Sequence, residues 1–294
     1  MSSYDYKILS LDGGGIRSIV QGVALKELPR IDYDLIVGTS GGAINACLLS
    51  IGYTPEDIIE FYSGECGKQI FKANFFPVPL SKSRYPSKNI EKMLNEKLGN
   101  FQLKDVQKNI VIVTYDIKNR RPVFFSNLNE EHRDIYLRDI ARASSAAPLY
   151  FEPYTLSSGI YIDGGLSANT PSAVVIGYVK EKLQVCNPLV VSLGTGSFQE
   201  SLSAGDLCVN NPIKFIINLI DCFMDGNQMT QQEISSDILQ ENFFRFQIHL
   251  DEKNKALDNI NPKNIQNLIE VTMNSIKNEW SSEIERLKKF IVSK

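Results

Sequence analysis

The sequence of 294 residues lacks the features that mark a disulfide-bonded, membrane-spanning or nucleic-acid-binding protein. Its five cysteines are odd in number and show no C-x-x-C spacing, which predicts free thiols in a reducing compartment. No apolar run approaches the ~18 residues that a membrane-spanning helix needs. Lysine and arginine total 31 against 34 aspartates and glutamates, a formal net charge of -3. Nucleic acid is therefore excluded as a partner, and any contact with lipid would be mainly apolar.

Histidine is scarce, although it is the usual base beside a nucleophilic serine. The chain has two, His132 and His249. His132 begins the tripeptide His-Arg-Asp, but no kinase glycine-rich loop or paired lysine accompanies it. The acidic residues lack the D-x-D-x-D-G spacing of a calcium loop, so we expect neither a metal nor a cofactor.

The chain does contain a regular alternation of strand and helix patterns. Short apolar or β-branched runs predict strands at 7–12, 34–38, 109–116, 122–126, 160–164, 189–194 and 243–250. Helical patterns lie at 16–28, 42–51, 55–63, 87–98, 133–143, 171–183, 211–224, 230–241, 262–276 and 278–292. The alternation predicts an α/β fold, a three-layer α/β/α sandwich with a mostly parallel central sheet. Without a repeat or linker, residues 1–294 are expected to form a single domain, more helical from about residue 200.

A first glycine-rich turn, Gly13-Gly14-Gly15, lies between the first predicted strand and the first predicted helix. Such a turn directs several backbone N–H groups to one point at a helix N-terminus, where negative charge is favoured. Three roles fit it: a phosphate cradle, an oxyanion hole, or close packing of helix on strand. A dinucleotide fingerprint is excluded because Ser18 occupies the position of its last glycine.

A second turn, Gly38-Thr39-Ser40-Gly41-Gly42, has the G-x-S-x-G pattern of a nucleophile elbow. The buried-strand pattern DLIV precedes it and the helical pattern AINACLLSIG follows it, as an elbow requires. An elbow holds its serine in a strained backbone conformation, and Gly38 and Gly42 are small enough to let strand and helix approach. Ser40 is therefore a candidate nucleophile, with no histidine near it in the sequence to act as its base.

A third turn, in the segment IYIDGGLSANTP, places Asp163 at the end of a predicted strand. Asp-Gly is a common hairpin signal, so a simple turn role is one interpretation. The other is functional, because a carboxylate on a glycine turn has no bulky neighbour to keep a serine hydroxyl away.

Together the three motifs DGGGIR, GTSGG and DGG resemble the patatin-like phospholipase family, in which they occur in this order. The segments at 143–154 (ASSAAPLYFEPY), 169–172 (NTPS) and 190–197 (VVSLGTGS) are also similar to patatin-family segments, so the resemblance covers most of the chain. The family often has glycine in place of Ser18 and threonine in place of Gly41. These departures affect fine specificity rather than the reaction.

The resemblance implies a patatin-like fold and a Ser–Asp dyad that works without histidine, with Asp163 accepting the proton of Ser40. It implies that the glycines at 13–15 supply N–H groups to an oxyanion hole, and that Arg17 steadies this loop or its charge. It also implies a calcium-independent phospholipase A or lipid acyl hydrolase that cleaves fatty-acyl esters of membrane lipids through an acyl-enzyme. Because Asp163 lies at a strand end, we expect Asp163→Asn to reduce turnover with little change in stability.

Two other interpretations stay open. His249 follows Asp163 in the chain, which is the order of a Ser-Asp-His triad of the α/β-hydrolase type, although His249 lies inside a predicted strand. Alternatively, the glycine loop belongs to a non-catalytic scaffold that holds a phosphate, and Ser40 is inert. A fluorophosphonate separates the enzyme from the scaffold, because only an activated serine reacts with it.

Two apolar segments carry a further alternative. Residues 70–80 and 211–224 are expected to pack in the core, and the alternative is a lid or acyl-chain entrance that contacts membrane. A free lipase needs restraint, so we expect an activating ligand, protein partner or self-assembly step, with a phospholipid membrane surface as the substrate. No signal peptide is recognised after Met1. The expected location is cytoplasmic and peripheral at membranes when active, with a secreted effector lacking a signal peptide as the alternative.

Overall fold

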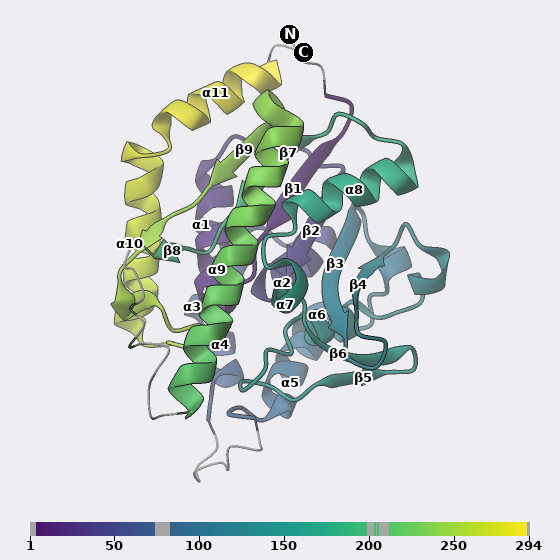
Figure 1. Ribbon diagram of the computed structural model, residues 1–294, viewed down its shortest axis with the longest axis vertical. Coiled ribbons are helices and arrows are strands. Elements are labelled where there is room, and N and C mark those ends of the chain that lie inside the picture. Colours follow the sequence, from purple (N-terminus) through teal and green to yellow (C-terminus); the bar gives the residue numbers. More distant parts are fainter. Residues whose placement is uncertain (1–3, 74–82, 199–202, 204, 206–211, 293–294) are drawn as a thin grey trace.

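The computed structural model describes residues 4–73, 83–198, 203, 205 and 212–292, and its centre is an eight-stranded sheet between two layers of helices (Figure 1). The order of the strands is β5-β6-β3-β2-β1-β7-β9, with β4 also beside β3. Their bounds are β1 Lys7–Leu11, β2 Leu35–Thr39, β3 Asn109–Asp116, β4 Arg121–Ser126, β5 Tyr154–Leu156, β6 Gly159–Asp163, β7 Leu189–Leu193 and β9 Phe243–Phe246. Strands β1, β2, β3, β7 and β9 pair in parallel, whereas β4, β5 and β6 form antiparallel pairs. The predicted α/β/α sandwich with a mostly parallel sheet is confirmed.

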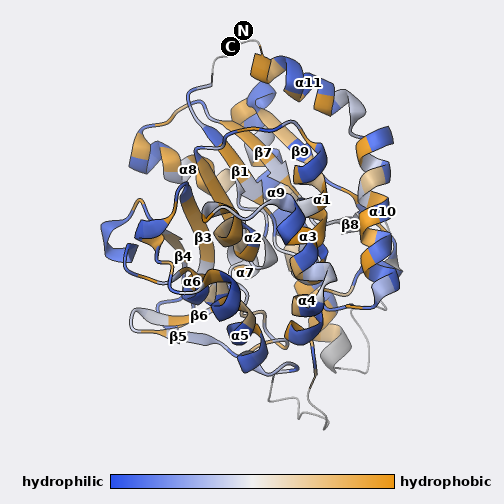
Figure 2. Cartoon of the chain, turned by 180° about the vertical axis from the view of Figure 1, so that it is seen from behind, coloured by the Kyte–Doolittle hydropathy of each residue, from blue (hydrophilic) through white to orange (hydrophobic). Residues whose placement is uncertain are grey.

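The helices form one layer on each face of the sheet. Their bounds are α1 Ile19–Glu27, α2 Gly41–Ser50, α3 Pro55–Ser63, α4 Glu65–Ile70, α5 Ser87–Leu98, α6 Leu137–Ser144, α7 Gly165–Ala168, α8 Ser172–Leu183, α9 Pro212–Leu239, α10 Pro262–Asn278 and α11 Ser281–Val292. Helices α7, α8 and α9 cover the face that is in front in Figure 1. Helices α1 to α6 and α10 cover the other face, which Figure 2 shows from behind.

Each central strand supplies side chains to two separate cores. In β3, Ile110 and Ile112 face the core under α1, α2 and α6, whereas Val111 and Val113 face the core under α7 and α8. Both faces of these strands are therefore buried, which explains their continuous apolar sequences, orange in the centre of Figure 2. A polar interruption in such a strand would leave a buried group without water.

Local signals set where several helices begin. Helix α3 starts after Thr54, whose hydroxyl accepts from the N–H of Asp57 while the Asp57 carboxylate accepts from the N–H of Thr54, and Pro55 occupies the first turn. Helix α10 starts after Asn261, which caps it, with proline again in its first turn. The predicted starts of both helices are confirmed. They could be predicted because the contacts that set them involve near neighbours in the sequence.

The largest differences between predicted and observed boundaries concern three parts of the chain. The predicted helices 211–224 and 230–241 are mostly parts of one helix, α9. The helix continues through the exposed Gly226, because one glycine inside a helix costs only a modest amount of free energy. The predicted strand 243–250 divides into β9 and the short strand β10 (His249–Leu250), which pairs with β8 (Ser197–Phe198) in a separate sheet. The predicted helix 133–143 begins only at Leu137, because the chain before it hydrogen-bonds to residues 103 and 104.

The C-terminal part of the chain completes the same sheet. Strand β9 pairs with β7 in parallel, and α10 packs against α1. The core residue Trp280 donates its indole N–H to the carbonyl of Gln247, which holds the start of α11 against the end of β9. One sheet therefore runs through the chain from residue 7 to residue 246.

Candidate active site

Ser40 lies in a sharp turn between β2 and α2, with φ 53° and ψ −121°. A positive φ is strained for a serine, and it exposes the side chain at the tip of the strand. A Cβ atom on Gly38 would lie 2.3 Å from the carbonyl oxygen of Gly42, and one on Gly42 would lie 2.3 Å from that of Leu11. The close approach of β2, α2 and β1 therefore requires glycine at both positions.

Ser40 lies next to Asp163 because β2 and β6 pair with the same edge of β3 and their C-terminal ends face each other. Strand β2 runs parallel to β3 and ends with Thr39 opposite Val113. Strand β6 comes from the other direction, antiparallel to β3, and ends with Asp163 opposite Thr114. The residue after β2 and the last residue of β6 are thus neighbours, although 123 positions separate Ser40 from Asp163 in the sequence.

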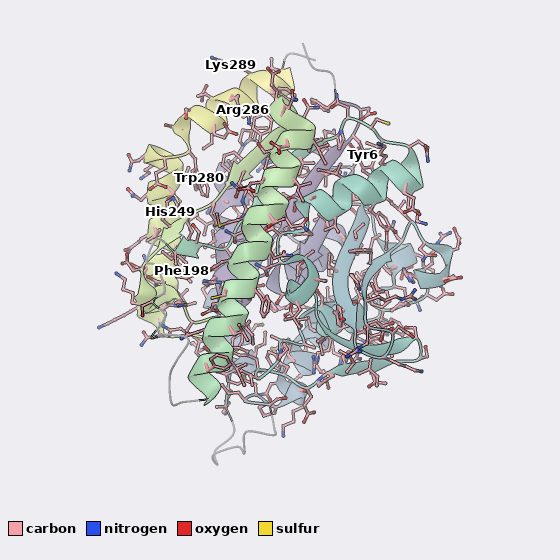
Figure 3. All side chains as sticks on the ribbon, viewed as in Figure 1. Tyr6, Phe198, His249, Trp280, Arg286 and Lys289 are labelled. Carbon is pink, nitrogen blue, oxygen red and sulfur yellow. The ribbon has the colours of Figure 1, made fainter. Side chains whose placement is uncertain are left out.

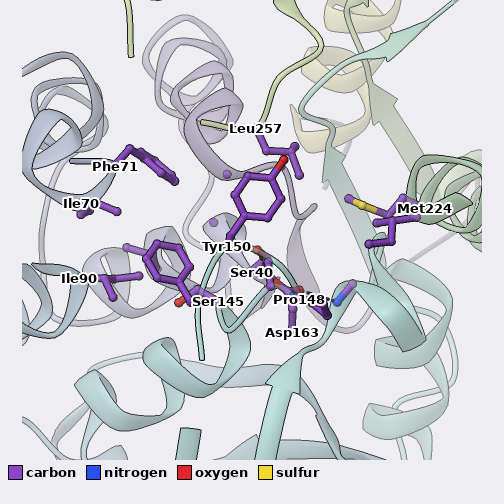
Figure 4. A pocket seen from close by; sticks show the side chains of 18 of the residues that line it. Ser40, Ile70, Phe71, Ile90, Ser145, Pro148, Tyr150, Asp163, Met224 and Leu257 are labelled. Carbon is purple, nitrogen blue, oxygen red and sulfur yellow. Dashed lines mark hydrogen bonds between the residues drawn. The ribbon is translucent and has the colours of Figure 1, made fainter. Parts of the chain in front are cut away.

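The two side chains form a direct hydrogen bond at the bottom of a pocket (Figure 4). Ser40 Oγ donates to Asp163 Oδ2 at 2.7 Å, and the Gly165 N–H donates to Asp163 Oδ1, also at 2.7 Å. Asp163 is only 5% exposed, and burial raises its pKa from 3.8 to about 6, against the opposing effect of these two donors. A carboxylate with this pKa is ionised at neutral pH and basic enough to accept a proton.

The glycine-rich loop lies beside the dyad, but its three amides are not equivalent. The Gly13 N–H donates to the carbonyl of Asn169 at 3.0 Å, so it is not available to an oxyanion, contrary to the prediction. Gly14 and Gly15 line the pocket, and their N–H groups have no acceptor in the described parts of the chain. Gly41 also lines the pocket, at the N-terminus of α2. The available donors are therefore the amides of Gly14, Gly15 and Gly41.

A buried ion pair holds the start of the glycine-rich loop in place. Asp12 is fully buried, and its Oδ2 accepts from Arg245 on β9 at 2.6 Å and from the hydroxyl of Thr170 at 2.7 Å. Burial raises the pKa of Asp12, and the guanidinium opposes this rise. The N–H of Ile16 donates to the carbonyl of Leu257 at 2.8 Å, which fixes the other end of the loop.

Arg17 lies behind the loop rather than in the pocket. Its side chain is 6% exposed, its guanidinium carbon lies 5.2 Å from the centre of the Phe198 ring, and its Nε and Nη1 have no partner in the described structure. Burial lowers its pKa, and the carboxylates of Asp221 and Asp225 on α9 oppose that effect. The arrangement suits support of the loop and its charge, as the resemblance implies for this residue.

Ser144, at the end of α6, was not singled out by the sequence. Its hydroxyl accepts the N–H of Ser40 at 2.9 Å and donates to the carbonyl of Val113 at 2.6 Å, while its own carbonyl accepts the N–H of Gly164. Ser144 thus joins the elbow, β3 and the turn after Asp163. Its segment was noticed only as a patatin-like stretch, and no pattern in it indicated this role.

The pocket above the dyad is almost entirely apolar. Its walls come from α2, α3, α4, α5, α7, α9 and the loops beside them, and include Ile44, Ile70, Phe71, Ile90, Tyr150, Phe151, Leu166, Ile220, Met224 and Leu257. Figure 4 shows Tyr150, Leu257 and Met224 around the opening above Ser40. Each of the two apolar segments therefore contributes to the pocket, through Ile70 and Phe71 and through Ile220 and Met224, so packing in the core is not their only role. Residues 74–80 of the first segment lie outside the described residues.

Neither histidine belongs to this site. His249 is exposed, pairs with Ser197 in the small sheet and has its Nδ1 3.1 Å from the Ser197 hydroxyl. Figure 3 shows it beside β8 and α10. His132 packs against the Phe125 ring at 5.0 Å and accepts from the N–H of Ser126. The triad with His249 is therefore wrong, because β10 turns away from the central sheet and takes this residue with it.

The dyad and the loops around it lie in the N-terminal part of the chain, which matches a known family. Residues 9–176 match the sequence profile described as Patatin-like phospholipase, and the match contains the glycine loop, the elbow and Asp163. The chain belongs to the patatin-like phospholipase family. Among the described residues, no helix combines the length and the hydropathy required to cross a bilayer.

Individual relatives agree with this assignment. The chain is 32% identical to Patatin-like protein 1 of Arabidopsis thaliana, over 65% of this chain and 58% of that protein. It is 32% identical to Calcium-independent phospholipase A2-gamma of Oryctolagus cuniculus, over 86% of this chain and 37% of that protein. The structure of VipD from Legionella pneumophila shares the fold, with a TM-score of 0.50 and 14% identity, over 94% of this chain and 67% of that chain. The chain spans about three fifths of the length of the Arabidopsis patatin-like proteins 1, 2 and 4.

Proposed function

We propose that this protein is a calcium-independent serine acyl hydrolase that cleaves fatty-acyl esters of membrane phospholipids. The observation that carries the proposal is the 2.7 Å hydrogen bond from Ser40 to a buried Asp163, at the base of an apolar pocket. Membership of the patatin-like phospholipase family supports the choice of lipid esters as substrates. The similarity to Calcium-independent phospholipase A2-gamma supports a reaction without calcium.

In the first half of the reaction, Ser40 Oγ attacks the ester carbonyl carbon while Asp163 takes the hydroxyl proton. Negative charge develops on the carbonyl oxygen, next to the N–H groups of Gly14, Gly15 and Gly41 and to the positive end of α2. The tetrahedral intermediate then expels the lysolipid alkoxide, which takes the proton from Asp163. The acyl group stays on Ser40.

In the second half, water takes the place of the leaving alcohol. Asp163 accepts a proton from the water, and the resulting hydroxide attacks the acyl carbon. When the second intermediate collapses, the bond to Ser40 Oγ breaks, the proton returns from Asp163 to that oxygen, and the fatty acid leaves. One carboxylate thus serves both halves, so no histidine is needed.

The narrowness of the pocket supports the further proposal that the site is restrained until a membrane, ligand, partner or assembly step widens it. Its volume is about 70 Å³, room for a few water molecules rather than a long acyl chain. Met224 on α9 and Leu257 stand over the opening. Because the chain has a net charge of -3, its attachment to a phospholipid surface would depend on apolar contacts. We place the active protein peripherally at such a surface.

The test combines labelling of Ser40 with lipid analysis. Wild-type protein is expected to react with a fluorophosphonate at Ser40 and to release fatty acid from phosphatidylcholine vesicles, as measured by mass spectrometry. Ser40→Ala should lose both activities and keep its fold. The matched control is Ser50→Ala, which removes a buried hydroxyl from the far end of α2; within the described residues this hydroxyl binds the Cys47 carbonyl alone. Failure of the wild type to label, together with phosphate binding at the glycine loop, would favour the scaffold interpretation.

A further inference from the structure

Asn169 has a buried side chain that the reaction described above does not use. The residue is 3% exposed, and its Oδ1 has no hydrogen-bond partner in the described structure. Its backbone is fully engaged: the N–H donates to Asn227 at 2.8 Å, and the carbonyl accepts from Gly13 at 3.0 Å. The side-chain amide is therefore the part of Asn169 that can hydrogen-bond to a water or a ligand. A buried acceptor without a donor is unfavourable unless a water or ligand supplies one.

This amide oxygen lies beside both members of the dyad. A Cβ atom on Gly13 would lie 2.3 Å from Asn169 Oδ1 and 3.2 Å from Ser40 Cβ. A Cβ atom on Gly165 would lie 3.1 Å from Asp163 Oδ1 and 3.2 Å from Asn169 Oδ1. Because both positions are glycine, no Cβ atom stands between the amide oxygen, Ser40 and Asp163. Any side chain at Gly13 would collide with this amide.

The acyl-enzyme creates a need for donors at this place. In the free protein Asp163 Oδ2 accepts from Ser40, but an acylated Ser40 has no proton to donate. In the acyl-enzyme, Asp163 Oδ2 therefore lacks a donor, and so does Asn169 Oδ1, which a Cβ atom on Gly165 would contact together with the carboxyl group of the same aspartate. A water molecule has two O–H groups and can satisfy both, and its lone pair is then free for the acyl carbon.

We propose that the Asn169 side chain positions the hydrolytic water, an inference that rests on the proposed acyl hydrolase function. The water donates one hydrogen bond to Asp163, which takes that proton as the oxygen attacks the acyl carbon. The second O–H donates to Asn169 Oδ1 and keeps its proton, which leaves in the carboxyl group of the fatty acid. Asn169 neither gains nor loses a proton, so its contribution is orientation alone.

This role predicts a preference for water over alcohols. An alcohol has a single O–H, which Asp163 must accept, so an attacking alcohol makes no hydrogen bond to Asn169. Loss of the amide should therefore slow hydrolysis and leave alcoholysis unchanged. A change that only disturbs the fold would slow both reactions together.

The experiment measures how the acyl-enzyme divides between water and methanol. Wild type and Asn169→Leu are given p-nitrophenyl butyrate at fixed methanol concentration, and the methyl ester and free acid are quantified. We expect the ratio of ester to acid to rise roughly 3- to 10-fold in Asn169→Leu, the range that one net hydrogen bond supports. The initial burst of p-nitrophenol, which reports acylation, should stay within about twofold of wild type.

Two further variants control for structural effects. Asn169→Asp keeps an acceptor oxygen, so its product ratio should remain near the wild-type value even though the added charge shifts its pH profile upward. Asn227→Ala disturbs the segment that carries Asn169 but keeps the amide, so its ratio should change less than that of Asn169→Leu. Asn169→Ala replaces the leucine variant if that protein does not fold.

An unchanged product ratio in folded Asn169→Leu or Asn169→Ala overturns the assignment of the water. It leaves the proposed function intact as long as the wild type shows a burst and Ser40 is labelled. Absence of the burst and of labelling in the wild type would instead remove the proposed function, and with it the acyl-enzyme on which Asn169 acts.

Discussion

Two residues of the site are held in states that reduce the stability of the fold. Ser40 has a positive φ, and Asp163 is a buried carboxylate that only two donors stabilise. Such strain and desolvation are common where a structure prepares a nucleophile and its base. Substitutions at these positions should therefore change activity and stability in opposite directions.

Asp163→Asn should lower turnover by about 10²–10⁴, because the amide cannot accept the proton of Ser40. It should also raise stability by about 1–3 kcal/mol at pH 8, since it removes a carboxylate whose pKa is raised by folding. The gain is present above pH 6, falls as the pH decreases from 6 to 3.8, and vanishes below 3.8, where the wild-type carboxyl is protonated in both states. Urea unfolding at pH 8 and pH 4 measures this. Because burial at a strand end was not recognisable in the sequence, this replaces the expectation of unchanged stability.

The pH dependence of catalysis should follow the same carboxyl group. Since Asp163 acts as a base, kcat/KM should rise with pH below about 6 and level off above that value. His249→Ala, measured over the same range with a soluble ester, should give the same profile. A step near the pKa of histidine that this substitution removes would contradict the dyad.

Ser18 and Gly41, the two positions that depart from the family pattern, are in contact. A Cβ atom on Gly41 would lie 2.2 Å from Ser18 Oγ and 3.0 Å from Ser18 Cβ. Gly41→Thr alone should therefore destabilise the protein by about 1–3 kcal/mol and disturb the elbow. Adding Ser18→Gly removes both contacts with Ser18 but leaves the one with the Gly15 carbonyl oxygen at 2.9 Å, so it should recover part of the stability and activity. A double-mutant cycle in which the two changes are simply additive would show that the pair is not coupled.

At the scale of elements, the end of α6 joins the two strands that carry the dyad. The Ser144 hydroxyl is the acceptor for the N–H of Ser40, and its carbonyl accepts from the residue after Asp163. The nucleophile and its base are therefore positioned by the same residue. Helix α9 has a comparable double role, since Met224 lines the pocket while Phe223, 61% exposed, faces outward.

Ser144→Ala should lower both kcat and stability, because the buried N–H of Ser40 loses its acceptor. The expected loss of stability is about 1–3 kcal/mol, the cost of an unsatisfied buried group. Ser144→Thr keeps the hydroxyl and should retain more of both properties. The comparison is Ser50→Ala, whose hydroxyl donates to the Cys47 carbonyl within α2 and lies outside the pocket, with ester turnover and urea unfolding as the measurements. Equal effects of the two alanine variants would deny Ser144 a special role.

At the scale of the whole molecule, the active site depends on both ends of the chain. The ion pair of Asp12 with Arg245 joins the glycine loop to β9 across 233 positions of sequence. The pairing of β7 with β9 extends one sheet into the C-terminal part. These contacts support the prediction of a single domain, because the C-terminal part supplies a residue that holds the N-terminal loop.

Arg245→Met should destabilise the protein by about 3–5 kcal/mol, because it leaves the Asp12 carboxylate buried without its cation. Adding Asp12→Asn removes the uncompensated charge and should restore much of that loss. Thermal unfolding of the single and double variants measures the difference. If the double variant is less stable than Arg245→Met, the carboxylate has another partner in the folded protein that compensates its charge.

The sequence by itself determined the features that depend on near neighbours. Continuous apolar runs predict strands buried on both faces, and Thr54 and Pro55 set the start of α3 within one turn. The elbow at Ser40 was recognisable for the same reason, since Gly38 and Gly42 are needed where strand and helix cross within five residues. Such patterns are local because backbone sterics and capping hydrogen bonds act over a few positions.

Only the tertiary structure decided which of these features meet. Strands β2 and β6 end against each other because both pair with the same edge of β3, and no local pattern encodes that register. In the folded chain the Gly13 N–H donates to the Asn169 carbonyl, and the Ser144 hydroxyl accepts from the N–H of Ser40. His249 lies in a separate sheet. These contacts form between distant positions when strands pair and side chains are buried. The sequence therefore indicated the candidate site residues, and the tertiary packing determined which of them come together.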